Sequence, residues 1–111
     1  MEDVITLELP ADLSAPKAAR DALARWGVNA EADVVVSELV TNAVKHGTSP
    51  IVLVAVRMAD RVRVEVRDER PDVGGPQSDS AGLRLVDAFS LEWGVRPVPG
   101  DGKVVFAEFP P

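Results

Sequence analysis

The chain contains two valine-rich segments separated by only two residues, and this pair constrains the fold more than any other feature. IVLVAVRM (51–58) and RVRVEVRD (61–68) flank Ala59 and Asp60. In the second segment hydrophobic and charged side chains alternate: Val62, Val64 and Val66 stand between Arg61, Arg63, Glu65 and Arg67. A period of two is typical of a strand with one buried face. The pair therefore predicts an antiparallel hairpin whose arginines lie on the solvated face.

Two helices are predicted ahead of this hairpin, after a first strand at residues 4–9 whose side chains also alternate. The first helix lies within residues 11–27, where Pro16 suits the first turn. The second helix runs from about residue 30 to residue 45. Both have suitable terminal residues, which are Ser14 and Gly27 for the first helix and Asn29 and Gly47 for the second.

The C-terminal third of the chain predicts one more helix and two more strands. A short helix at residues 81–90 precedes strands at 91–98 and 103–109, which flank a Pro-Gly-Asp-Gly turn. We therefore expect an α/β fold, a two-layer sandwich in which helices cover one face of a mixed or antiparallel sheet. With 111 residues, the chain is expected to form a single domain, residues 1–111.

The composition argues against several classes of function. Cysteine is absent, which excludes disulfides and thiolate metal sites and fits a reducing compartment. The formal net charge of −6 argues against general nucleic-acid binding. The longest purely apolar run, residues 51–56, is too short to span a bilayer, and the acidic N-terminus does not have the pattern of a signal peptide. We expect a cytoplasmic protein that binds neither nucleic acid nor membrane directly.

The predicted second helix carries two polar residues, Glu38 and Asn42, in a run that is otherwise largely apolar. Positions four apart are separated by about 40° around a helix axis, so these side chains are neighbours. His46 follows one turn later. The hydrophobic residues share one arc, which consists of Val36, Leu39, Val40, Ala43 and Val44. Glu38 and Asn42 therefore lie at the border of the predicted core, where they face either a cleft or solvent.

The pattern E-L-x-x-N-A followed by basic residues is formed here by Glu38, Leu39, Asn42, Ala43, Lys45, His46 and Gly47. With this motif and the two below, nearly the whole chain resembles the gyrase, chaperone, histidine-kinase and mismatch-repair ATPase superfamily (the Bergerat fold). Within it, the chain looks most like the small bacterial anti-sigma-factor serine kinases. The resemblance implies that Asn42 binds Mg²⁺ between the phosphates of ATP, and that Glu38 is the general base. Mg²⁺ takes few protein oxygens, and a base one turn away sits near the terminal phosphate. His46 lies either at the pocket rim or in solvent.

The second family motif, D-x-G-x-G after a strand, is only partly present. Asp68 ends the predicted strand, while Arg70 and Asp72 stand where the glycines would be. The resemblance implies that Asp68 accepts a hydrogen bond from the adenine amino group, and the alternative is an ordinary turn residue. A carboxylate only accepts, so a base read by Asp68 should be adenine, with ATP preferred over GTP by at least about tenfold.

The third motif, G-x-G-L at a helix start, corresponds to SAGL at residues 80–83. The resemblance implies that the backbone N–H groups of Ala81, Gly82 and Leu83 face the phosphates, which agrees with the anion affinity of a helix N-terminus. The alternative is a serine-capped helix with a packing glycine. Residues 69–81 are rich in proline and glycine and correspond to the family's lid over the nucleotide, or else form a disordered connection.

The resemblance as a whole implies an Mg-ATP-binding regulatory protein. Its activity would be transfer of the γ-phosphate to a serine or threonine of an anti-sigma-factor antagonist, and it would sequester a sigma factor, as a homodimer. The alternative is a degenerate binding module with little or no turnover. The lost glycines favour this alternative, as do Val104 and Val105, which replace a threonine usual in the family's last strand. A nucleotide-free structural domain would leave the pair Glu38 and Asn42 unexplained.

Overall fold

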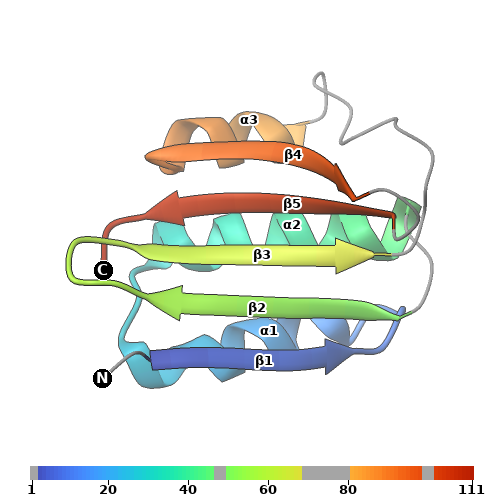
Figure 1. Ribbon diagram of the computed structural model, residues 1–111, viewed down its shortest axis with the longest axis horizontal. Helices are drawn as coiled ribbons and strands as arrows, with labels where there is room; N and C mark the ends of the chain where they lie inside the picture. The colour runs from blue at the N-terminus through green and yellow to red at the C-terminus, as the bar shows by residue number, and fades with distance from the viewer. Residues whose placement is uncertain (1–2, 47–49, 69–80, 99–101) are drawn as a thin grey trace.

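The computed structural model describes residues 3–46, 50–68, 81–98 and 102–111. These residues form one five-stranded sheet in the order β1-β2-β3-β5-β4, in which every neighbouring pair is antiparallel. The strands are β1 (Asp3–Leu9), β2 (Ile51–Arg57), β3 (Val62–Asp68), β4 (Glu92–Val98) and β5 (Gly102–Phe109). The helices are α1 (Ala15–Leu23), the short 3₁₀ helix η1 (Ala24–Trp26), α2 (Ala30–His46) and α3 (Ala81–Phe89). All of them lie on one face of the sheet, as predicted (Figure 1).

The hairpin of β2 and β3 is confirmed. Val62 pairs with Arg57 and Val66 with Leu53, so the two strands run antiparallel as predicted. The three alternating valines of β3 are all buried toward the helices. On its other side β3 pairs with β5, and this places Asp68, the last residue of β3, directly opposite Lys103.

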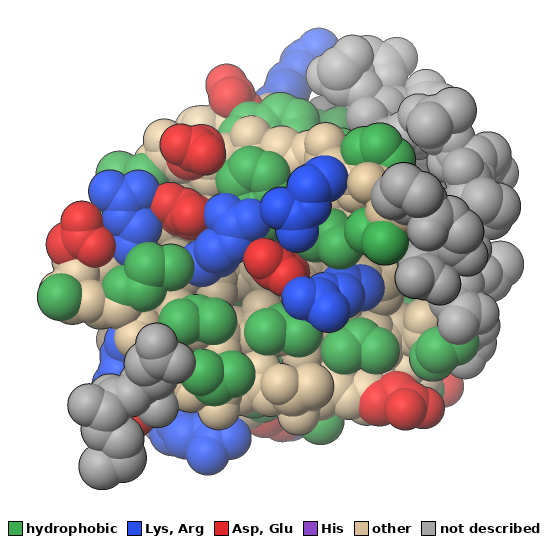
Figure 2. All heavy atoms as spheres, viewed as in Figure 1, with side chains coloured by type: hydrophobic (Ala, Val, Ile, Leu, Met, Phe, Trp, Pro, Cys, Tyr) green, Lys and Arg blue, Asp and Glu red, His purple; other side chains and the backbone are tan. Residues whose placement is uncertain are grey.

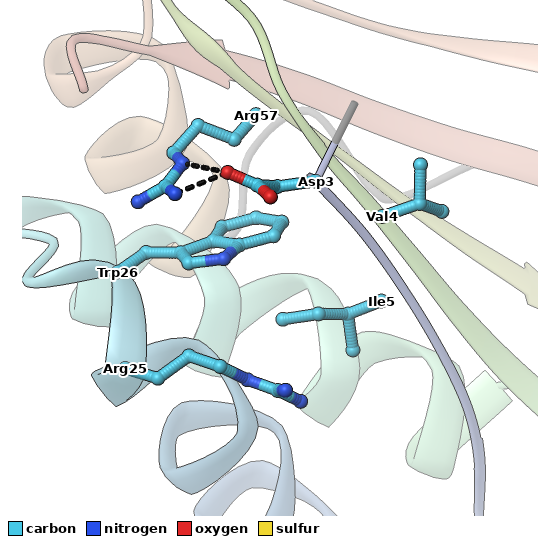
Figure 3. A pocket seen from close by; sticks show the side chains of 6 residues that line it. All are labelled: Asp3, Val4, Ile5, Arg25, Trp26 and Arg57. Carbon is cyan, nitrogen blue, oxygen red and sulfur yellow. Dashed lines mark hydrogen bonds and ion pairs between the residues drawn. The ribbon is translucent and has the colours of Figure 1, made fainter. Parts of the chain in front are cut away.

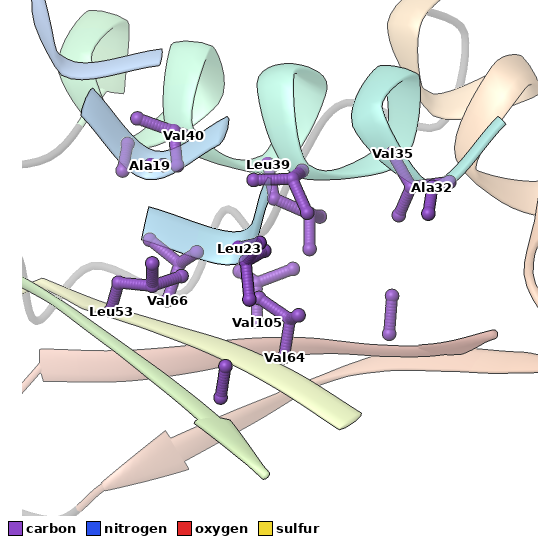
Figure 4. Close-up of a cluster of buried hydrophobic side chains, with 14 of the residues drawn as sticks. Ala19, Leu23, Ala32, Val35, Leu39, Val40, Leu53, Val64, Val66 and Val105 are labelled. Atoms are coloured by element: carbon purple, nitrogen blue, oxygen red, sulfur yellow. The ribbon is translucent and has the colours of Figure 1, made fainter. Parts of the chain in front are cut away.

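The core lies between the sheet and the helices α1 and α2 (Figure 4). Helix α2 contributes a stripe of buried side chains three and four residues apart: Ala32, Val35, Val36, Leu39, Val40 and Ala43. The sheet meets it with Leu53, Val64, Val66, Val105 and Ala107. Burying a valine or leucine side chain stabilises a fold by about 1.5–3 kcal/mol, so this stripe fixes the rotation of α2. Val44, at the edge of the predicted arc, is half-buried and packs against the core.

The two predicted helix starts differ. The side chain of Asn29 caps α2, because its Oδ1 accepts a hydrogen bond from the Ala32 N–H at 2.8 Å. Ser14 occupies the N-cap position of α1, but its side chain makes no capping bond and donates to Asp12 instead. Gly27 has a φ of 65°, the left-handed conformation that suits glycine, and it ends η1. Gly47 lies outside the described residues.

The sheet face that points away from the helices carries interspersed charged and hydrophobic side chains (Figure 2). The arginines predicted to be solvated are ion-paired there: Arg61 and Arg63 bond Glu108, and Arg63 and Arg67 bond Glu65. Only 19% of the Arg63 side chain is exposed, since its guanidinium also lies 4.1 Å from the centroid of the Phe106 ring. The prediction that the arginines lie on the solvated face is therefore partly wrong for Arg63.

These ion pairs lower the pKa values of two carboxyl groups. Hydrogen bonds from Arg61 and Arg63 hold the pKa of Glu108 below its ordinary value. Burial alone would raise the pKa of Glu65, but hydrogen bonds from Arg67 and Arg63 outweigh burial and lower it. Both carboxylates therefore stabilise the fold in their charged form. No helix in the described part of the chain is long and apolar enough to cross a membrane.

Candidate functional site

Helix geometry puts Glu38 and Asn42 on the flank of α2 nearer α3. On the opposite flank, Arg20 of α1 donates a hydrogen bond to the Ser37 side chain at 2.8 Å. At about 100° per residue, Glu38 and Asn42 lie across the buried stripe from Ser37. Since α2 packs against α1 on one side and α3 on the other, the pair borders the space between α2 and α3. Both residues are half-buried, as expected for the border of the core.

Asn42 contains a buried polar atom that lacks a protein partner. Its side-chain nitrogen, Nδ2, is buried and makes no hydrogen bond in the structure as described. Leaving a buried donor unpaired costs about 1–3 kcal/mol, so native proteins rarely keep one without a reason. An amide held in this way at the edge of a core is suited to binding a ligand that supplies the missing acceptor.

The three predicted motifs lie toward the same end of the molecule. The C-terminal end of α2, the end of β3 and the N-terminal end of α3 all lie at the same end (Figure 1). Asp68 is buried there, and Leu83 is buried in the first turn of α3. Ala81 and Gly82 begin this helix, so its predicted start at residue 81 is confirmed, and residue 81 belongs to the helix rather than to the overlapping loop range. Three segments far apart in the sequence thus contribute a carboxylate, an amide and a helix N-terminus to one region.

Asp68 is paired with a lysine that the sequence did not single out. Lys103 Nζ lies 3.2 Å from Oδ2 and 3.4 Å from Oδ1 of Asp68. Both residues are buried, with 3% of Asp68 and 8% of Lys103 exposed. The pair could have been predicted only from the register between β3 and β5. A register that places Val66 opposite Val105 also places Asp68 opposite Lys103. Asp68 is therefore part of a buried ion pair as well as a strand end.

The residues at this end fit a bound Mg²⁺-nucleotide. The described residues contain no group of three or more His, Cys, Asp or Glu that could hold a metal by itself. Mg²⁺ does not require such a group, because it keeps waters and phosphate oxygens and takes one or two ligands from protein. The Oδ1 atom of Asn42 would supply such a ligand, while the unpaired Nδ2 would donate to a phosphate oxygen. Glu38, one turn away, would take part in neither of these two contacts of Asn42.

Two predicted elements of the site cannot be placed. Most of the predicted lid, residues 69–80, lies outside the described residues. His46 is the last residue of α2, and its side chain also lies outside the described part of the chain. The positions of the lid and of His46 therefore stay predictions.

A separate pocket of about 330 Å³ lies at the other end of the sheet (Figure 3). Asp3 accepts hydrogen bonds from Arg57, whose guanidinium carbon lies 5.4 Å from the centroid of the Trp26 ring. Arg25 lies along the same hollow (Figure 3). Arg57 pairs with Val62 at the start of β3, whereas Asp68 ends that strand. This pocket therefore contains none of the predicted site residues.

Comparisons with known proteins agree with the fold. No protein-family model matches the chain, and a search of curated proteins finds no match. Among solved structures, the chain is similar to the crystal structure of the RsbU and RsbW domains of Rv1364c from Mycobacterium tuberculosis, with a TM-score of 0.71 and 24% sequence identity. The similarity covers 97% of this chain and 32% of that one, so this chain spans about a third of the matched length. The predicted two-layer α/β fold is confirmed.

Proposed function

We propose that this chain is an Mg-ATP-binding regulatory domain of the anti-sigma-factor type that phosphorylates a protein antagonist on serine or threonine. The observation that carries the proposal is the buried Nδ2 of Asn42, which has no hydrogen-bond partner, one helical turn from the half-buried carboxylate of Glu38. The E-L-x-x-N-A pattern supports it, as does the fold likeness to a structure that contains an RsbW domain.

Each residue of the candidate site would have a separate role. Asn42 would hold the metal through Oδ1 and bind a phosphate oxygen through Nδ2. Glu38 would accept the proton of the attacking hydroxyl, and Asp68 would accept from the purine base. The first turn of α3 would direct its N–H groups at the phosphates, where the helix dipole favours negative charge. The metal would neutralise charge on the transferring phosphoryl group.

The partners of the domain are proposed on the same basis. They are an antagonist protein that receives the phosphate and a sigma factor that the domain sequesters, and the domain acts as a homodimer. These assignments rest on the motif resemblance, because a fold shared with part of a larger protein does not carry that protein's partners.

A second candidate function is a binding module with little or no turnover. The ion pair between Asp68 and Lys103 favours it, because a carboxylate that shares its oxygens with a lysine is less available to the base. The half-buried Glu38 opposes it, since a module without chemistry has no need of a base beside Asn42.

Phosphoryl transfer separates these two functions. The chain would be incubated with Mg²⁺ and γ-labelled ATP together with candidate antagonist proteins, with Glu38→Gln as the inactive control. Label on a serine or threonine of one antagonist, lost in Glu38→Gln, supports the kinase. Nucleotide binding without label on any candidate supports the module, and absence of nucleotide binding contradicts both.

A further inference from the structure

Lys103 changes what the base-binding end of the site recognises. Its Nζ faces both oxygens of the Asp68 carboxylate, at 3.2 Å and 3.4 Å. Both side chains are shielded from water. Any ligand that approaches Asp68 must therefore share these oxygens with the lysine or displace it.

The strand pairing fixes this arrangement. Lys103 lies opposite Asp68 in the register of β3 and β5, on the same side of the sheet as the buried Val66 and Val105. A buried ammonium group is costly without an opposite charge, so Nζ stays beside the carboxylate. Two hydrogen-bonded strands thus place a hydrogen-bond acceptor, the Asp68 carboxylate, next to a donor, Lys103 Nζ.

We propose that Lys103 sets the base preference of the nucleotide pocket: paired with Asp68, it lets the pocket accept a purine with a carbonyl at position 6 nearly as well as adenine. The inference rests on the proposed nucleotide site. It revises the expectation from the sequence, in which Asp68 alone reads the base and prefers adenine by at least about tenfold.

The hydrogen-bonding capacity of the two side chains leads to this result. A carboxylate only accepts, so by itself it pairs with the adenine amine and repels the carbonyl oxygen of guanine. An ammonium group only donates. Beside Asp68, it gives the guanine carbonyl a donor while the ring N1–H of guanine donates to the carboxylate. Adenine presents its donor and acceptor in the opposite order, so it is satisfied when the ends of the two side chains exchange places: its amine then donates to Asp68 and its ring N1 accepts from Lys103.

The test compares dissociation constants for the Mg²⁺ complexes of ATP, GTP and inosine triphosphate, measured by calorimetry. We expect the parent to bind the three nucleotides within about threefold of one another. Lys103→Met, which removes the donor and keeps the length, should raise the preference for ATP to at least about tenfold. Inosine triphosphate has the carbonyl without the guanine amine, so it should follow GTP.

Two control variants accompany this comparison. Lys103→Arg keeps a cationic donor and should keep the parental ratios. Lys17→Met makes the same change at a lysine of α1 whose side chain is 73% exposed, and it should also keep the parental ratios. Circular dichroism of each variant establishes that it is folded.

The outcomes separate this inference from the proposed function. An ATP preference of tenfold or more in the parent overturns the inference, whatever the variants do, and leaves the nucleotide site intact. ATP binding with the same ratios in the parent and in Lys103→Met also overturns it. Failure of the folded parent and variants to bind any nucleotide overturns the proposed function, and the inference with it.

Discussion

Arg20 of α1 donates a hydrogen bond to the Ser37 side chain of α2 at 2.8 Å, and this contact joins the two helices on the flank opposite Glu38. From helix geometry, the buried stripe of α2 and this bond indicate that Glu38 and Asn42 lie on the side of α2 nearer α3. The chemical roles of the two residues follow from this position, and each role can be tested separately.

Glu38→Gln should separate binding from chemistry. The variant keeps the size and polarity of the side chain, so nucleotide affinity should change little. Without a general base, phosphoryl transfer should slow by about 10²- to 10⁴-fold. Single-turnover transfer measures the chemical step directly. The matched control is Glu31→Gln, an exposed glutamate in the first turn of the same helix, which should transfer at the parental rate. Parental transfer by Glu38→Gln would show that Glu38 is not the base.

Asn42→Ala should not destabilise the free protein. The substitution removes a buried donor without a partner, and alanine is the better helix former. We expect the free energy of unfolding to stay within about 0.5 kcal/mol of the parent or to rise. Urea denaturation measures it, with Leu39→Ala as a sensitivity control that should cost about 2–5 kcal/mol. A loss above 1 kcal/mol in Asn42→Ala, on the same scale, would mean that the amide contributes to the core rather than to a ligand site.

The two helix starts give a paired prediction about stability. Asn29→Ala removes an observed capping bond at 2.8 Å, so it should cost about 0.5–2 kcal/mol. Ser14→Ala removes a side chain that makes no capping bond to α1, so its cost should be smaller. Urea denaturation of both variants under one condition compares them. Equal losses would contradict the distinction between the two residues.

Acid should weaken the charged network on the outer sheet face. Because the folded protein lowers the pKa of Glu108, this carboxylate stabilises the fold above its unfolded value of about 4.5, and that contribution is lost as the pH falls through the folded pKa. Glu108→Gln should therefore cost about 1–3 kcal/mol at pH 7, and the difference from the parent should shrink below pH 4.5.

Urea titrations between pH 7 and pH 3 measure this difference. Glu8→Gln removes one exposed carboxylate from β1, a strand that does not pair with β5, and so controls for the change in net charge. A stability difference between the parent and Glu108→Gln that stays constant over the whole range would contradict the role of the ion pairs.

Local patterns predicted the elements of this fold well. The buried residues Val62, Val64 and Val66, for example, alternate with charged residues in the sequence. The same local logic was ambiguous at helix starts, where Asn29 and Ser14 look equivalent until their hydrogen bonds are known. Element ends differ from the predicted ones by about one residue, which is within the range over which assigned ends commonly vary.

Contacts across the sheet were the part that the sequence could not supply. The pair Asp68 and Lys103 depends on the register between β3 and β5, and the burial of Arg63 depends on Phe106 and Glu108 of β5. Each side chain, taken alone, predicts a solvent-facing or turn residue. Only the pairing of strands that are distant in sequence turns them into a buried ion pair and a stacked guanidinium.

The most direct test of the nucleotide site is calorimetric titration of ATP with Mg²⁺ and with EDTA. The comparison uses the parent, Asn42→Ala, and Thr41→Ala as a control at the adjacent half-buried position of α2. We predict that Mg²⁺ strengthens ATP binding to the parent and to Thr41→Ala, and that Asn42→Ala loses most of this response, with affinity at least about tenfold weaker in Mg²⁺. A parent that binds no ATP, or an Asn42→Ala variant with the full parental response to Mg²⁺, would contradict the assignment of Asn42 and of the site built around it.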